Sequence, residues 1–104
     1  STEEELGCGI HGGVGETSLM RHLRPDLVRM ELTSRNVPEH LAENEHVKFG
    51  GTVSFGWLAS DFGPDGHIGD PTGATAERGA ASFDAAVRRL CDAFSEIAAF
   101  RFTE

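Results

Sequence analysis

The sequence has 104 residues, a length that suits one domain and is too short for two. Of these residues 38% are hydrophobic and 25% charged, a composition typical of a soluble domain. Seventeen Asp and Glu residues against nine Lys and Arg residues give a formal net charge of -8, which disfavours nucleic acid and anionic membranes as partners. No apolar run is long enough to span a bilayer, and two cysteines are too few for a disulfide scaffold, so we expect a cytoplasmic protein.

The acidic start, Ser1 to Glu5, lacks the basic and then apolar order of a secretion signal. It also lacks an initiator methionine, which either processing or a position within a longer polypeptide explains.

Glycines are concentrated between Gly7 and Gly15 and again between Gly50 and Gly73. Such clusters are typical of loops with unusual backbone angles. They form either one site assembled from two loops or two unrelated tight turns.

The first half of the chain predicts only short elements. Residues 16–23 favour a helix, capped by Thr17 or Ser18 and ended before Pro25. Residues 27–32 partly alternate between apolar and polar side chains, as in a short strand. Residues 38–44 are expected to form one or two helical turns.

The second half contains the clearest pattern. Alternating apolar residues predict a strand over Thr52–Leu58, followed by a long loop over residues 61–75. A helix with one continuous apolar face follows, and it begins either after an N-cap at Ser82 or earlier, within residues 74–77. The spacing of four, three, four and three residues that defines this face joins Phe83, Val87, Leu90, Phe94 and Ile97. One long helix, one shorter helix and at most two strands do not cover one another as a self-sufficient α/β domain, so the sequence predicts the second half of something larger.

One histidine is placed for chemistry. His11 is flanked by glycines, which leaves the ring accessible, and Glu16 follows at the expected start of a helix. Histidine exchanges protons near neutral pH, and a nearby carboxylate can orient it for general acid/base catalysis. The structural alternative is a loop histidine bonded to a backbone carbonyl beside a glutamate that only caps its helix.

The other candidates are weaker. His67 lies in the second glycine-rich loop, and Cys8 lies near His11 without a companion for a thiol nucleophile. The five histidines and two cysteines show no metal-ligand spacing. No metal ligand is therefore predicted within this sequence.

Two motifs make the sequence recognisable. The stretch from His11 to Met20 reads HGGVGETSLM, and LRPDLV follows at residues 23–28. The stretch from Gly56 to Gly79 contains GW, GHIGDPT and ATAERG in that order. Together they resemble the creatininase (creatinine amidohydrolase) family over nearly the whole chain.

The resemblance implies a three-layer αβα fold, to which residues 1–104 contribute the C-terminal portion. It also implies metal-dependent hydrolysis of a C–N amide bond in a cyclic amide, a formamide or a peptide-like substrate. His11 matches the family's proton-shuttling histidine, and Glu16 matches the glutamate that supports its loop. Substrate contacts are expected from Gly7, Cys8, Gly12 and Gly13.

The sequence also departs from the family pattern. The Glu-x-His and Asn-Gly-His motifs that carry the family's metal ligands are absent. Two divalent ions, zinc or manganese, are therefore expected to be bound mainly by an N-terminal portion, present as a separate chain or a cleaved product. Creatinine-specific members have Trp-Asp where this sequence has Gly7-Cys8, which disfavours creatinine as the substrate. The resemblance further implies a higher oligomer.

Two alternatives remain from the sequence. The chain is either a non-catalytic subunit that completes a metal-bearing partner and shapes its specificity, or an inactive proteolytic fragment. The retained His11 and Glu16 favour the catalytic hypothesis over a purely structural subunit.

Overall fold

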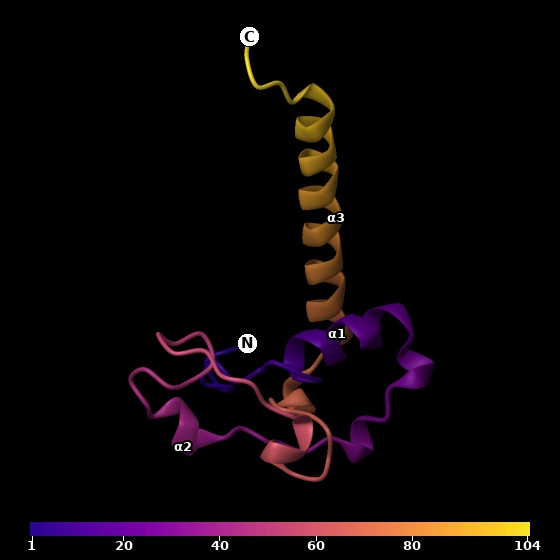
Figure 1. Ribbon diagram of the computed structural model, residues 1–104. Coiled ribbons are helices and arrows are strands. Elements are labelled where there is room, and N and C mark those ends of the chain that lie inside the picture. The colour runs from indigo at the N-terminus through magenta and orange to yellow at the C-terminus, as the bar shows by residue number, and fades with distance from the viewer.

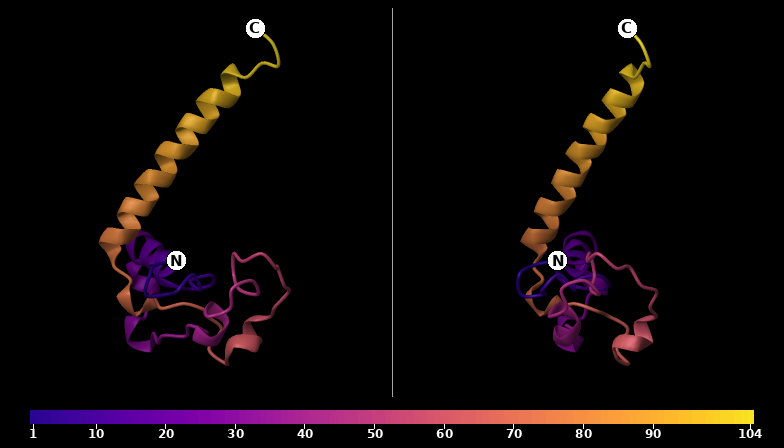
Figure 2. Two further views of the ribbon diagram at one scale, coloured as in Figure 1. Left: turned by 90° about the vertical axis from the view of Figure 1, so that its left-hand side faces the viewer. Right: turned by 60° about the vertical axis from the view of Figure 1, so that its left-hand side comes forward.

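The computed structural model describes all 104 residues as a body of loops and short helices from which one long helix projects (Figure 1). Helix α1 spans Val14–Leu23, α2 spans Glu39–Ala42 and α3 spans Ala76–Ala99. Short 3-10 turns cover Pro25–Leu27, Met30–Leu32, Ala59–Phe62 and Pro71–Gly73. Two further views show the same arrangement, with the C-terminus at the far end of α3 (Figure 2).

Helix α1 begins two residues before its predicted start. Gly13 is the N-cap and supplies no side-chain cap, so the prediction that Thr17 or Ser18 caps the helix is wrong. Both hydroxyls bond elsewhere: that of Thr17 donates to the Gly12 carbonyl at 3.3 Å, and that of Ser18 accepts the Thr75 amide at 3.1 Å. The earlier start lets Val14 be buried in the body.

Neither predicted strand forms. Residues 27–32 form parts of two 3-10 turns, because Pro25 presets a turn conformation at the end of α1. Within Thr52–Leu58 only Val53 makes a bridge, to Val47. The side chains of Phe55 and Trp57 instead gather with Phe49, at ring-centroid distances of 5.3 and 5.8 Å. A segment with alternating apolar residues forms a strand only when a neighbouring strand pairs with its backbone, and this chain supplies no such partner.

Helix α2 confirms the helical turn expected within residues 38–44. The loop expected over residues 61–75 is interrupted by the Pro71–Gly73 turn and by two bridges. One bridge joins His11 to Ile68 and the other joins Asn36 to Gly69, both antiparallel. The two glycine-rich loops therefore lie side by side, whereas their assembly into one site stays a prediction.

Helix α3 has the predicted apolar face and the earlier of the two predicted starts. Thr75 is the N-cap, and its hydroxyl accepts the Arg78 amide at 3.1 Å, so the prediction of a cap at Ser82 is wrong. The base of α3 packs against α1, where the rings of His22 and Phe83 lie 5.7 Å apart. Beyond that contact the exposed fraction of the apolar side chains rises from 38% at Phe83 to 67% at Ile97.

Few side chains are buried. Only 11 of 104 residues are buried, and Ile68, Glu5, Cys8 and Ser18 are the largest fully buried side chains. The radius of gyration is 17.1 Å, against about 13 Å for a compact domain of this length. Projection of α3, which is about 36 Å long, accounts for the difference. None of the helices has the combination of length and apolar character that crossing a bilayer needs.

The expected three-layer αβα architecture is not seen within these residues. The chain has helices and three isolated bridges but no extended strand, so no sheet layer forms. The apolar face of α3, which would pack on such a layer, is exposed instead.

Candidate functional site

His11 is held by its backbone while its side chain stays exposed. The His11 amide donates to the Ile68 carbonyl at 3.2 Å, and the Ile68 amide donates back to the His11 carbonyl at 2.7 Å. Ile68 is fully buried, so this pair joins the first loop to the second at the best-packed point of the body. The arrangement fixes the position of His11 without restricting access to its imidazole.

Glu16 supports the histidine loop through the main chain. Its carboxylate accepts the amide N–H of Gly12, the residue that follows His11. Gly12 has a positive φ of 66°, a conformation in which other residues are strained. A carboxylate in the first turn of α1 is also favoured by the helix dipole. Glu16 therefore contacts the backbone of the turn that presents His11, and its role in catalysis stays a prediction.

A groove of about 380 Å³ lies in front of His11. The first loop and α1 form one wall, and the segment after α1 forms the other. The groove combines an exposed imidazole with apolar and polar contacts, as ligand sites do. Its lining consists of His11, Gly12, Glu16, Thr17, Met20, Leu27, Val28, Arg29 and Thr33.

Of the four residues expected to contact substrate, only Gly12 lines this groove. Gly13 is buried behind the loop. Cys8 is also buried, and burial raises the pKa of its thiol, with the negative charge of Glu5 as a second contribution. Gly7 is exposed at a turn with φ of 78° and has no neighbour where a Cβ would stand. Substrate binding by these residues stays a prediction.

His67 has a structural partner. Its Nε2 lies 2.7 Å from the Ser34 carbonyl oxygen, and the Asn36 side-chain amide donates to the His67 carbonyl at 2.8 Å. The same amide donates to the Phe62 carbonyl at 2.7 Å. Asn36 thus orders the second loop, a role that the sequence did not assign to it.

Glu5 is the functional candidate that the sequence did not single out. Its side chain is 1% exposed and accepts three backbone amides. The donors are Thr2 at 3.1 Å, Val14 at 3.1 Å and Asp70 at 2.7 Å. A buried carboxylate needs such donors because it loses the hydrogen bonds of water. Nothing in the run of three glutamates, Glu3 to Glu5, marks the last one as buried.

No metal-ligand set forms within the chain. No three side chains among the histidines, cysteines, aspartates and glutamates lie close enough to hold an ion. His46 lies against Thr52, and His67 is bonded to Ser34. These residues alone therefore do not fit the two-metal centre that the family resemblance implies.

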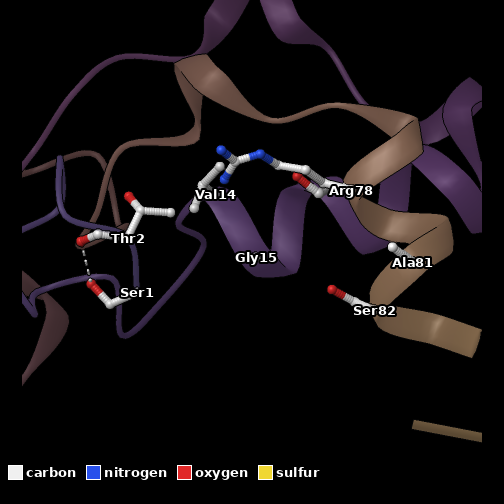
Figure 3. Close-up of a pocket in the computed structure, with 8 residues that line it drawn as sticks. Ser1, Thr2, Val14, Gly15, Arg78, Ala81 and Ser82 are labelled. Carbon is white, nitrogen blue, oxygen red and sulfur yellow. Dashed lines mark hydrogen bonds between the residues drawn. The ribbon is translucent and has the colours of Figure 1, made fainter. Parts of the chain in front are cut away.

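A second cavity lies on the other side of the α1 N-terminus. It has a volume of about 360 Å³ and lies between the N-terminal segment, α1 and the base of α3. Figure 3 shows the Arg78 side chain extending from α3 toward Val14, with Ser1 and Thr2 on the opposite side. His11 does not line this cavity, so it is separate from the groove.

A fixed loop that presents a free imidazole to a groove is suited to proton transfer. Residues 1–94 match the profile of the Creatininase family, described as creatinine amidohydrolase. The chain belongs to the creatininase family, which confirms the resemblance carried by its two motifs.

The chain is also similar to a candidate creatinine amidohydrolase from Bacteroides fragilis NCTC 9343, known from a crystal structure. The two share 28% sequence identity and superpose with a TM-score of 0.64. The similarity covers 91% of this chain and 37% of that protein, so the chain spans little more than a third of its relative's length. No functionally curated protein matches the sequence.

Proposed function

We propose that this chain supplies the proton-transfer loop of a metal-dependent amidohydrolase that cleaves a C–N amide bond. The observation that carries the proposal is the exposed imidazole of His11, whose backbone is paired to Ile68 at the edge of a groove. Membership of the creatininase family supports the reaction class.

In the proposed reaction, water adds to the amide carbonyl carbon and the C–N bond then breaks. The His11 imidazole takes a proton from the attacking water and passes it to the departing nitrogen, which leaves as an amine. Glu16 keeps the loop in place through the Gly12 amide, so the ring stays at the groove during both transfers. The products are a carboxylic acid and an amine, and His11 returns to its starting state.

Two divalent ions, zinc or manganese, belong to the proposal as activators of the attacking water. Because no ligand set forms among these 104 residues, we propose that the ions are held by further polypeptide that completes the fold. The exposed apolar face of α3 and the 37% coverage of the Bacteroides protein support this arrangement. The three-layer fold and a higher oligomer belong to the same proposal.

Metal removal tests the proposed function. The assembled enzyme that contains this chain is assayed with a cyclic amide, a formamide and a peptide amide, before and after treatment with a chelator. We expect turnover of one class, a loss of about 100-fold or more without metal, and recovery with zinc or manganese. No hydrolysis of any class by the metal-loaded enzyme would contradict the proposal. Equal turnover by the metal-bearing portion alone would favour the non-catalytic subunit.

A further inference from the structure

We propose that Glu5 is a positioning residue for His11, acting through the backbone of both glycine-rich loops. The inference rests on the proposed function, because it assigns Glu5 a part in the proton transfer by His11. Glu5 does not line the groove, so its role is to hold the loops and not to contact substrate.

The hydrogen bonds of Glu5 reach both sides of the His11–Ile68 pair. One carboxylate oxygen, Oε2, accepts the amide of Val14, three residues after His11, and the amide of Asp70, two residues after Ile68. The same atom therefore joins the start of α1 to the end of the second loop. The other oxygen, Oε1, accepts the Thr2 amide. Without the Oε2 acceptor the two loops would be joined here only by the backbone hydrogen bonds at Ile68, which leaves them more able to shift relative to each other.

Three glycines pack against this carboxylate. A Cβ on Gly9 or Gly13 would overlap a Glu5 carboxylate oxygen, and one on Gly69 would lie 2.6 Å from Oε2. The glycines come from both loops, so the carboxylate occupies the space that their missing side chains leave. Part of the glycine enrichment around His11 therefore serves Glu5.

The chemistry of the acceptor makes the proposal testable with a nearly isosteric change. An ionised carboxylate only accepts hydrogen bonds, whereas the side chain of Gln carries two donor hydrogens on one end. Three backbone amides donate to the two oxygens of Glu5. In Glu5→Gln the NH2 group replaces one of these oxygens, so at least one backbone N–H faces another N–H and has no acceptor. Glu3→Gln is the matched control, because Glu3 is exposed and its side chain makes no hydrogen bond.

Both variants are made in the assembled, metal-loaded enzyme, and kcat and KM are compared per mole of bound metal. A displacement of about 1 Å in a reacting group costs about 100-fold in rate, so we expect kcat of Glu5→Gln to fall by about that factor with KM unchanged. Glu3→Gln should keep the wild-type kcat. Folded, metal-loaded Glu5→Gln with wild-type kcat would overturn the proposal.

Hydrogen exchange gives a readout that needs no substrate. We expect at least one of the amides of Thr2, Val14 and Asp70 to exchange roughly tenfold faster in Glu5→Gln, because the NH2 end of Gln cannot accept its hydrogen bond, while the outer half of α3 is unchanged. Wild-type exchange at all three amides would overturn the proposal even if kcat fell. If Glu5→Gln does not fold, Glu5→Asp replaces it with the same expected and contradicting results.

Absence of hydrolysis in the wild type would instead contradict the proposed function, and the exchange result would still test whether Glu5 holds the loops.

Discussion

Two regions of the molecule differ in how completely this chain buries and pairs their side chains. They are the paired loops around Glu5 and the outer half of α3. Around Glu5 each buried polar side-chain atom has a hydrogen-bond partner, and Ile68 is fully buried beside it. On α3 the large apolar side chains beyond Phe83 are all more than 40% exposed.

The contrast assigns different roles to the two regions. The loops obtain their geometry from contacts within the chain, so the position of His11 is determined locally. Helix α3 carries an apolar face that only additional surface can bury, since burial of such a face is the main favourable term in helix packing. The geometry around His11 is therefore a property of this chain, whereas burial of the α3 face belongs to the proposed assembly with further polypeptide.

The contact between the two regions offers the largest effect on stability. A Cβ on Gly79 would overlap the Ser18 carbonyl oxygen and lie 2.9 Å from the Cβ of His22, so Gly79→Ala must force α3 away from α1. We expect a loss of about 3 kcal/mol in the free energy of unfolding, as for an overpacked core. Chemical denaturation of the enzyme measures it.

The control for this variant is Gly15→Ala in α1, where a Cβ would meet no atom within 4 Å. Alanine is the better helix former by about 1 kcal/mol, so the control should be neutral or stabilising. Equal effects of the two substitutions would show that α1 and α3 do not meet at Gly79.

A substitution on the outer half of α3 tests whether its apolar face is covered in the assembled enzyme. Phe94→Lys removes a side chain whose burial contributes about 2 kcal/mol, so assembly should weaken by about 30-fold. Asp92→Lys introduces the same side chain on the opposite face and should leave assembly unchanged. Size-exclusion chromatography over a concentration series measures both, and equal behaviour of the two variants would contradict a buried α3 face.

The helices were the most predictable part of the fold. The spacing of apolar residues identified α3, and Thr75 at its start satisfies the earlier of the two predicted boundaries. The strand over Thr52–Leu58 failed because alternation describes a side-chain pattern, whereas a strand also requires backbone partners that no other segment of the chain provides. Residues 27–32 also lack strand partners, and Pro25 in addition sets a turn at their start.

The site was predictable to a different extent. Glycines around His11 correctly indicated an accessible ring, and the structure brings Glu16 to the same loop through the Gly12 amide. Glu5 was not predictable, because its burial depends on Asp70, which is 65 residues away in the sequence. A glycine cluster signals close backbone approach, but it does not identify the group that occupies the space.

The most direct test of the central claim compares His11→Ala with His40→Ala in the metal-loaded enzyme. His40 is exposed on α2 and lies outside the groove, so its loss controls for removal of an imidazole as such. We expect kcat of His11→Ala to fall by about 100- to 10,000-fold, the usual contribution of a general acid/base, while metal content and His40→Ala turnover stay at wild-type values. Wild-type turnover by His11→Ala with both metals bound would contradict the assignment of His11 as the proton-transfer residue.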